Sequence, residues 1–158
     1  MTSNDLIEIE SSLGIKIPEA YAVIVCSEEM RLKYEEGEFE SGLLFDRKRI
    51  EDENIGYREI PVARDYWNPS WFVIHVDGGG NAYFITTDPY DERVYGFDHE
   101  QTFPGYDATD SPAFCGLSEF LVYLDSEKRW EEESLGRNKK PSMMKLFLEW
   151  FFNNTRKG

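Results

Sequence analysis

The sequence predicts an α+β domain in which helices pack on one face of a mostly antiparallel sheet. Residues 71–99 contain three short apolar runs, at 71–76, 82–87 and 94–97, which are rich in β-branched and aromatic residues. On both sides of this stretch, apolar residues recur at the spacing of an α-helix. Helices and strands are therefore segregated along the chain, in the order helix, helix, strands, helix, helix.

The three apolar runs should form an antiparallel meander. A glycine-rich corner, DGGGN at 77–81, separates the first two runs, and an Asp-Pro turn, DPYD at 88–91, separates the last two. A phosphate-binding glycine loop leads into a helix, whereas this corner leads into AYFITT, which has the composition of a strand. We therefore interpret the glycines as a tight corner, with Asp77 and Asn81 serving turn geometry.

Two helices are expected before the strands. Asn4 or Asp5 can cap the first helix, and Gly14 is well placed after its last turn. Pro18 suits the start of the second helix, because its missing amide would have no partner there, and this helix should cover residues 20–30.

The segment between these helices and the meander predicts three further elements. Residues 39–45 read as a strand, and residues 59–63 as a short edge strand restricted by its proline. Between them, Asp46 can cap a short helix over 47–55, whose many charges should keep most of it in solvent.

Two more helices should follow the meander. One begins at Ser118, and the other covers 141–152 with large apolar residues at helical spacing. At 158 residues the chain is long enough for one domain that buries roughly 70% of its unfolded surface. We predict a single domain over 1–158, with 135–158 as a C-terminal helical extension.

The cysteines and the termini indicate a cytoplasmic protein. Cys26 and Cys115 lie far apart on apolar stretches, without metal-ligand or disulfide spacing, and are predicted to be reduced core residues. The first ten residues lack the features of a signal peptide. The most apolar C-terminal run is too short to span a bilayer, so no membrane association is expected.

Charge is the most informative property of the composition. The formal net charge is −14, and nine carboxylates against the single base Arg93 place −8 of it between Asp65 and Asp110. Such a surface repels a phosphate backbone, which disfavours direct nucleic-acid binding. The same field would steer a basic protein partner toward it. The alternative is that the acidity merely keeps the protein dispersed.

The sequence offers weak support for catalysis or a metal site. Asp98 and His99 are adjacent in a strand and should point to opposite faces, so they are poor joint ligands. The acidic turn with Asp88, Asp91 and Glu92 has oxygens for weak Ca²⁺ binding but lacks the spacing of a dedicated calcium loop. No nucleophile elbow or activated cysteine is recognisable. We therefore expect no catalytic residue, no metal ligand and no cofactor.

Three ring-bearing residues stand out near the meander. His75 interrupts an apolar run, and a lone histidine there is expected to be hydrogen-bonded or sheet-facing. Tyr66 and Trp67 lie in a polar loop before the first strand. Local packing is the commoner fate of such residues, and anchoring a partner is the alternative.

Five blocks of the sequence, taken in order, resemble the SUKH superfamily, which is named after fungal cell-wall assembly regulators. The resemblance covers most of residues 7–124, and its specificity lies in the order and spacing of the blocks. The blocks are LGIKIPEAYAVIV (13–25), IPVARD (60–65), DGGGNAYFI (77–85), VYGFDHE (94–100) and LSEFLVYL (117–124).

This resemblance implies an α+β domain without catalytic residues. Bacterial members are regarded as immunity proteins that bind and block a cognate toxin, often a nuclease, and fungal members resemble regulatory scaffolds. Residues 135–158 continue past the usual end of the family, and their helix is expected to cover the core, to pair with a second copy of the chain or to help hold a partner. The chain is accordingly expected to be a monomer or a homodimer. The candidate partner-binding residues are Tyr66, Trp67, Asp77, Asp88, Asp91, Glu92 and Asp98.

Our leading hypothesis is an immunity protein that neutralises a basic toxin domain. A regulatory scaffold that binds an endogenous protein is the first alternative. A metal-dependent hydrolase that uses the acidic meander is the second.

Overall fold

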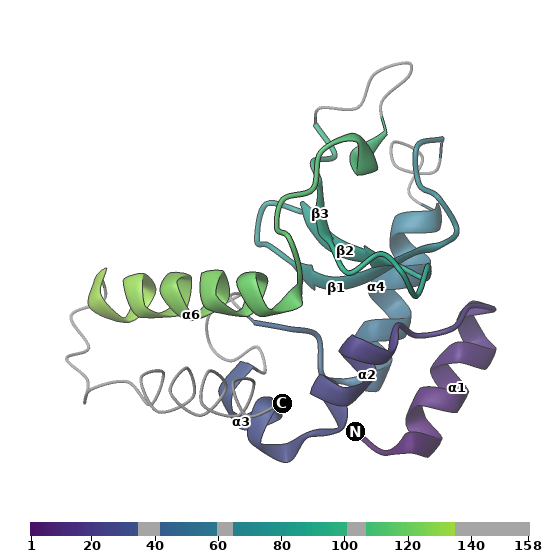
Figure 1. Cartoon of the computed structure of the whole chain (residues 1–158), viewed down its shortest axis with the longest axis horizontal. Helices are drawn as coiled ribbons and strands as arrows, with labels where there is room; N and C mark the ends of the chain where they lie inside the picture. Colours follow the sequence, from purple (N-terminus) through teal and green to yellow (C-terminus); the bar gives the residue numbers. More distant parts are fainter. Residues whose placement is uncertain (35–41, 60–64, 101–106, 135–158) are drawn as a thin grey trace. The chain divides into compact units, whose positions relative to one another are not determined.

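The structure, a computed structural model, describes residues 1–34, 42–59, 65–100 and 107–134 (Figure 1). It divides into two compact units, Met1–Lys128 and Arg129–Gly158, and the following description concerns the first. The described helices are α1 (Ser3–Leu13), α2 (Glu19–Cys26), α3 (Glu28–Tyr34), α4 (Arg47–Glu59) and α6 (Leu117–Ser134), of which α6 runs past the end of the first unit. The strands are β1 (Trp71–Val76), β2 (Ala82–Thr86) and β3 (Val94–Phe97), and a 3₁₀ turn, η1, covers Ala108–Asp110.

The three strands form the predicted antiparallel meander, in the order β1-β2-β3. Phe72 pairs with Ile85, and Ile85 in turn pairs with Val94. The corner between β1 and β2 closes at Gly80, whose φ of 84° is in the left-handed region that favours glycine. The predicted α+β class, with its segregated helices and antiparallel sheet, is confirmed.

The first two helices start and stop through local backbone chemistry. Thr2, rather than Asn4 or Asp5, is the N-cap of α1, and Asp5 completes a capping box with it. Gly14 ends this helix with a φ of 68°, as predicted. The expected single helix over 20–30 is divided, because Ser27 is extended and separates α2 from α3.

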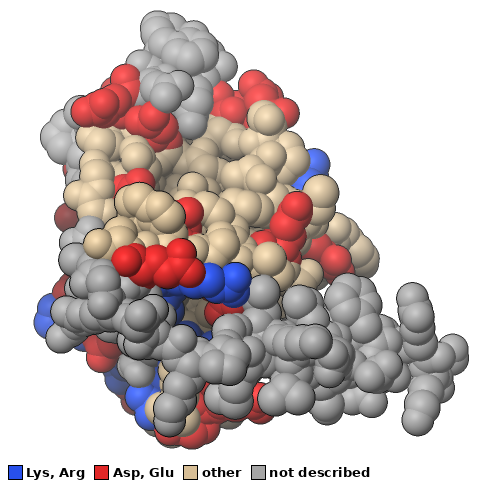
Figure 2. Space-filling view, turned by 90° about the vertical axis from the view of Figure 1, so that its left-hand side faces the viewer, with Lys and Arg blue, Asp and Glu red and all other residues tan. Residues whose placement is uncertain are grey.

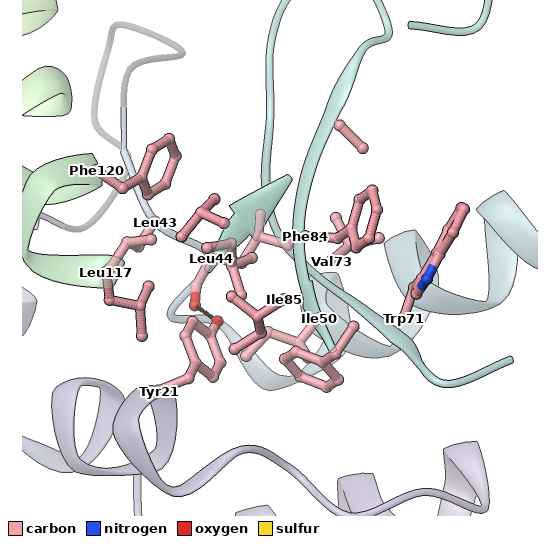
Figure 3. Packing of buried hydrophobic residues seen from close by; sticks show 14 of the residues in the cluster. Tyr21, Leu43, Leu44, Ile50, Trp71, Val73, Phe84, Ile85, Leu117 and Phe120 are labelled. Carbon is pink, nitrogen blue, oxygen red and sulfur yellow. Dashed lines mark hydrogen bonds between the residues drawn. The ribbon is translucent and has the colours of Figure 1, made fainter. Parts of the chain in front are cut away.

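Both faces of the sheet are covered by side chains. On one face, Tyr21 of α2 contacts Phe72 edge-on, and its hydroxyl donates to the carbonyl oxygen of Leu44 (Figure 3). Phe120 of α6 packs on Tyr83 on this same face. Neighbouring strand residues point to opposite faces, so Phe84 lies on the other face, where the Trp67 ring covers it. The sequence predicts the helical cover of the first face, and on the second face Trp67 packs with Tyr57 of α4.

The outer edge of β1 is closed by a side chain of α4. Asn54 is fully buried, accepts a hydrogen bond of 2.8 Å from the Val73 amide and donates one of 3.1 Å to the Val73 carbonyl oxygen. Its amide nitrogen also donates to the carbonyl oxygen of Ile50 at 2.9 Å. The Asn54 side chain thus satisfies backbone groups that a fourth strand would otherwise pair.

This contact explains why α4 differs from the sequence prediction. Asp46 caps the helix as expected, accepting a 2.9 Å hydrogen bond from the Arg49 amide. The helix then continues to Glu59 and buries Ile50, Asn54 and Tyr57, although a mostly solvated helix was predicted.

The two cysteines correct another prediction. Cys26 and Cys115 are both exposed, rather than in the core. Cys26 is the last residue of α2, where Val25 takes the buried position, and Cys115 immediately precedes the buried start of α6 at Leu117.

Several predicted segments cannot be compared with the structure. The strand at 59–63, the helix at 141–152 and the extension at 135–158 lie mainly or wholly outside the described residues. The strand predicted at 39–45 is wrong over its described part, because residues 42–45 form no strand and only Leu43 takes part in a β-bridge. Among the described residues, no helix combines the length and apolarity needed to cross a membrane.

Replacing Asn54 tests the importance of the edge contact. Asn54→Ala would leave the buried amide and carbonyl groups of Val73 without their partner, and we expect a loss of about 2–4 kcal/mol in the free energy of unfolding. Urea denaturation measures this loss. Asn4→Ala, on the exposed surface of α1, is the matched control and should change stability by less than about 0.5 kcal/mol. Equal effects of the two substitutions would contradict the proposed edge closure.

Candidate functional site

The acidic candidates lie at two opposite ends of the meander. Asp77 follows β1 and Asp98 follows β3, and the pairing of Val76 and Phe97 with the same residue of β2, Ala82, places both carboxylates at one end. Asp88, Asp91 and Glu92 belong to the turn between β2 and β3, at the other end (Figure 1). The carboxylates that sequence reasoning groups together are thus divided by the length of the sheet.

The Asp77 side chain stabilises the corner between β1 and β2 by accepting hydrogen bonds within it. Its Oδ1 accepts hydrogen bonds from the amides of Gly79 (2.9 Å) and Asn81 (2.8 Å), and its Oδ2 accepts one from the Asn81 side chain (2.9 Å). Partial burial opposes ionisation, but these hydrogen bonds outweigh it and lower the pKa of Asp77. The sequence interpretation that Asp77 and Asn81 serve turn geometry is confirmed.

Asp91 holds together the base of the other turn. Its Oδ2 accepts hydrogen bonds from the hydroxyls of Thr86 (3.2 Å) and Tyr95 (2.9 Å), and its Oδ1 accepts one from Nε of Arg93 (2.7 Å). Burial opposes ionisation, but the hydrogen bonds from Arg93 and Tyr95 outweigh it and lower the pKa of Asp91. Only 11% of the side chain is exposed, so Asp91 is a brace within the turn.

Asp88 shapes the tip of the same turn. Its backbone carbonyl oxygen accepts from the Asp91 amide at 3.1 Å, and its Oδ1 accepts from the Tyr90 amide at 3.0 Å. Asp88 and Glu92 are exposed, and Tyr90 between them is 93% exposed. Sequence reasoning missed Tyr90. The available signal was its place as the third residue of an Asp-Pro turn, where a side chain has little chance of reaching the core.

The two aromatic candidates of the loop before β1 have different environments. Trp67 is only 6% exposed, and its ring contacts those of Tyr57, Trp71, Phe84 and Phe97. Local packing, the commoner fate expected from the sequence, therefore accounts for Trp67. Tyr66 is half-buried against the core and retains some exposed surface.

His75 has the role expected from the sequence. It is 4% exposed, and its Nδ1 lies 2.6 Å from the carbonyl oxygen of Gly42, a geometry in which the ring nitrogen donates. Burial lowers the pKa of His75, and the hydrogen bond to Gly42 offsets this only in part. The ring also packs on Tyr83 and Phe120, so His75 joins the sheet to the N-terminal end of α6.

The described carboxylates do not converge on a metal-binding geometry. Within the described part of the chain, no three His, Cys, Asp or Glu side chains are grouped so that they could hold a metal ion. His99 instead lies with Nδ1 at 3.3 Å from the Asn81 side-chain oxygen, beside the corner. On the face drawn in Figure 2, acidic groups are separated by uncharged surface, which is a better arrangement for distributed protein contact than for chelation.

One comparison with known proteins is positive. The sequence matches the SMI1 / KNR4 family (SUKH-1) over residues 1–132. The chain belongs to this family. The match confirms the resemblance found in the sequence blocks and covers α1 through most of α6. The family is generally non-catalytic, and membership is consistent with a protein-binding domain of the immunity or regulatory type. No curated protein and no solved structure matches the chain.

The distinction between bracing and exposed carboxylates predicts different stability effects. Asp91→Ala would remove hydrogen bonds from Thr86, Arg93 and Tyr95, and we expect it to lower the free energy of unfolding by about 1–3 kcal/mol. Glu92→Ala, one residue away and exposed, should change it by no more than about 0.5 kcal/mol. Thermal and urea unfolding of both variants make the comparison. A larger loss of unfolding free energy for Glu92→Ala than for Asp91→Ala would show that Asp91 does not brace the turn.

The lowered pKa of the buried His75 predicts that the protein loses stability at mildly acidic pH. Because its pKa is lowered in the folded state, the unfolded chain binds a proton more readily as pH falls through the ordinary value of 6.5. Between about pH 7.5 and about pH 5.5, this difference should cost at most about 1.4 kcal/mol for each pH unit. His75→Gln, which can still donate to Gly42 but does not titrate, should flatten the dependence of the urea midpoint on pH. An unchanged slope would exclude His75 as its source.

Proposed function

We propose that this chain is a non-catalytic protein-binding domain that acts in the cytoplasm as the immunity partner of a toxin. Membership of the SMI1 / KNR4 family supports the proposal, because bacterial members of the SUKH superfamily, which the sequence blocks resemble, are regarded as immunity proteins. The partner is a basic protein domain, and a nuclease fits best, since a nuclease must present cationic groups to the phosphates of its substrate.

The charge distribution supports this choice of partner. The segment between Asp65 and Asp110 carries −8 of the net charge of −14, which favours rapid association with a basic surface. Close charge pairs of this kind couple by ~1.5–7 kcal/mol when they are desolvated, whereas charges at the rim act mainly on the association rate. An inhibitor of this type occupies the surface that the toxin's substrate would use.

The rigidity of the two acidic ends also favours a binding role. The carboxylates of Asp77 and Asp91 accept hydrogen bonds from residues of their own turns. The exposed carboxylates Asp88 and Glu92 are therefore displayed from a backbone that is already ordered, which reduces the entropy lost when a partner binds.

Co-expression tests the proposal directly. The C-terminal domain of the polypeptide encoded by the adjacent gene would be expressed in a host cell with and without this chain. We expect growth arrest with that domain alone, rescue when this chain is present, and co-purification of the two as a stoichiometric complex.

Two observations sharpen the result of that experiment. An active-site variant of the toxin domain, which does not arrest growth, should still co-purify, because binding does not require toxicity. Rescue should also disappear when the chain is replaced by an unrelated acidic protein of similar net charge. Failure of this chain both to rescue growth and to co-purify would refute the immunity function.

A further inference from the structure

The most exposed aromatic ring of the described chain is at the tip of the β2–β3 turn. Tyr90 is 93% exposed, and the next most exposed large apolar residue, Leu32, is 71% exposed. A ring in this position contributes no packing to the fold, yet it offers a large apolar surface with a polar end that a partner can bury. Aromatic residues of this kind are frequent among the few that dominate binding energy.

Hydrogen bonds to Asp88 fix the backbone at Tyr90 and at the residue after it. The Asp88 side chain accepts a hydrogen bond from the Tyr90 amide, and the Asp88 carbonyl oxygen accepts one from the Asp91 amide. Asp91 in turn fixes Arg93 and Tyr95 at the start of β3. The turn therefore presents the ring on ordered backbone, and the remaining freedom is that of two side-chain torsions.

The charges around the ring select the partner. Arg93 is the one base in the turn, and its guanidinium is occupied by the Asp91 carboxylate at 2.7 Å. Asp88 and Glu92 lie two residues before and two residues after Tyr90 in the chain, and both are exposed. Among the ion pairs of the described residues, neither carboxylate has a cationic partner, whereas Arg93 is paired with Asp91.

We propose that Tyr90 is the anchor of the partner interface, and that it receives an arginine side chain from a basic protein between its ring and the carboxylates of Asp88 and Glu92. This inference rests on the proposed function and adds to it the contact residue and the end of the sheet that is used. Guanidinium groups bind both to aromatic faces and to carboxylates, which favours arginine over lysine here. Arg93 makes the same type of contact within the chain, 5.5 Å from the centre of the Tyr95 ring.

The proposal assigns different roles to neighbouring carboxylates. Asp88 and Glu92 contact the partner, whereas Asp91 is a positioning residue that acts through the turn. Asp77 and Asp98, at the opposite end of the sheet, are outside this interface.

The test measures binding of full-length variants to the toxin domain encoded by the adjacent gene, in an inactive form, by calorimetry and surface-based kinetics. Tyr90→Ala should weaken binding by about 30-fold or more, as expected for an anchor, whereas Tyr90→Phe should retain most of the affinity. The matched control is Leu32→Ala on α3, which also truncates an exposed apolar side chain and should leave affinity unchanged. Melting temperatures of all variants establish that each one is folded.

A second pair of variants tests the charges. Asp88→Asn with Glu92→Gln should slow association and reduce its dependence on salt. Glu100→Gln with Asp110→Asn removes the same number of exposed charges elsewhere and should have a smaller effect. If the wild type binds and Tyr90→Ala binds equally well, the anchor is refuted while the immunity function stands. If the wild type forms no complex, the proposed function fails and the anchor fails with it.

Discussion

The pairing of the Asn54 side chain with the backbone of Val73 is the contact on which the sheet depends. A three-stranded sheet has two open edges, and each unpaired amide or carbonyl that is buried there costs free energy. A primary amide carries one acceptor and a donor group in the geometry of a peptide, so asparagine can replace a strand at one position. The Leu44 amide extends this closure by donating to the carbonyl oxygen of Ile74.

The outer edge of β3 is closed by backbone hydrogen bonds rather than by a side chain. The amide of Val94 on β3 donates to the carbonyl oxygen of Phe114, whose own amide donates back to Val94. Residues that lead into α6 therefore cover the start of β3. Together with Asn54, they leave the turns as the parts of the meander that face solvent, which keeps the carboxylates of Asp88 and Glu92 exposed.

The features that sequence reasoning predicts correctly are local ones. The meander, the capping of α4 by Asp46 and the termination of α1 by Gly14 depend on neighbouring residues, and the structure confirms each of them. The burial of Asn54 was not predictable, because its partner Val73 is 19 residues away and nothing in a charged helix marks one asparagine as internal. Within the candidate site, sequence places the acidic residues on turns, but only the hydrogen-bond geometry separates the bracing Asp91 from the exposed Asp88 and Glu92.

The separation of brace and tip within the β2–β3 turn bears on how such a domain can change over evolutionary time. Asp91 supplies the hydrogen bonds that secure the turn, while Tyr90 and Glu92 contribute almost nothing to the core. Mutations at the tip are therefore nearly neutral for folding and can be fixed without compensating changes in the scaffold. The surface of this turn can therefore change in sequence while the fold that carries it stays the same.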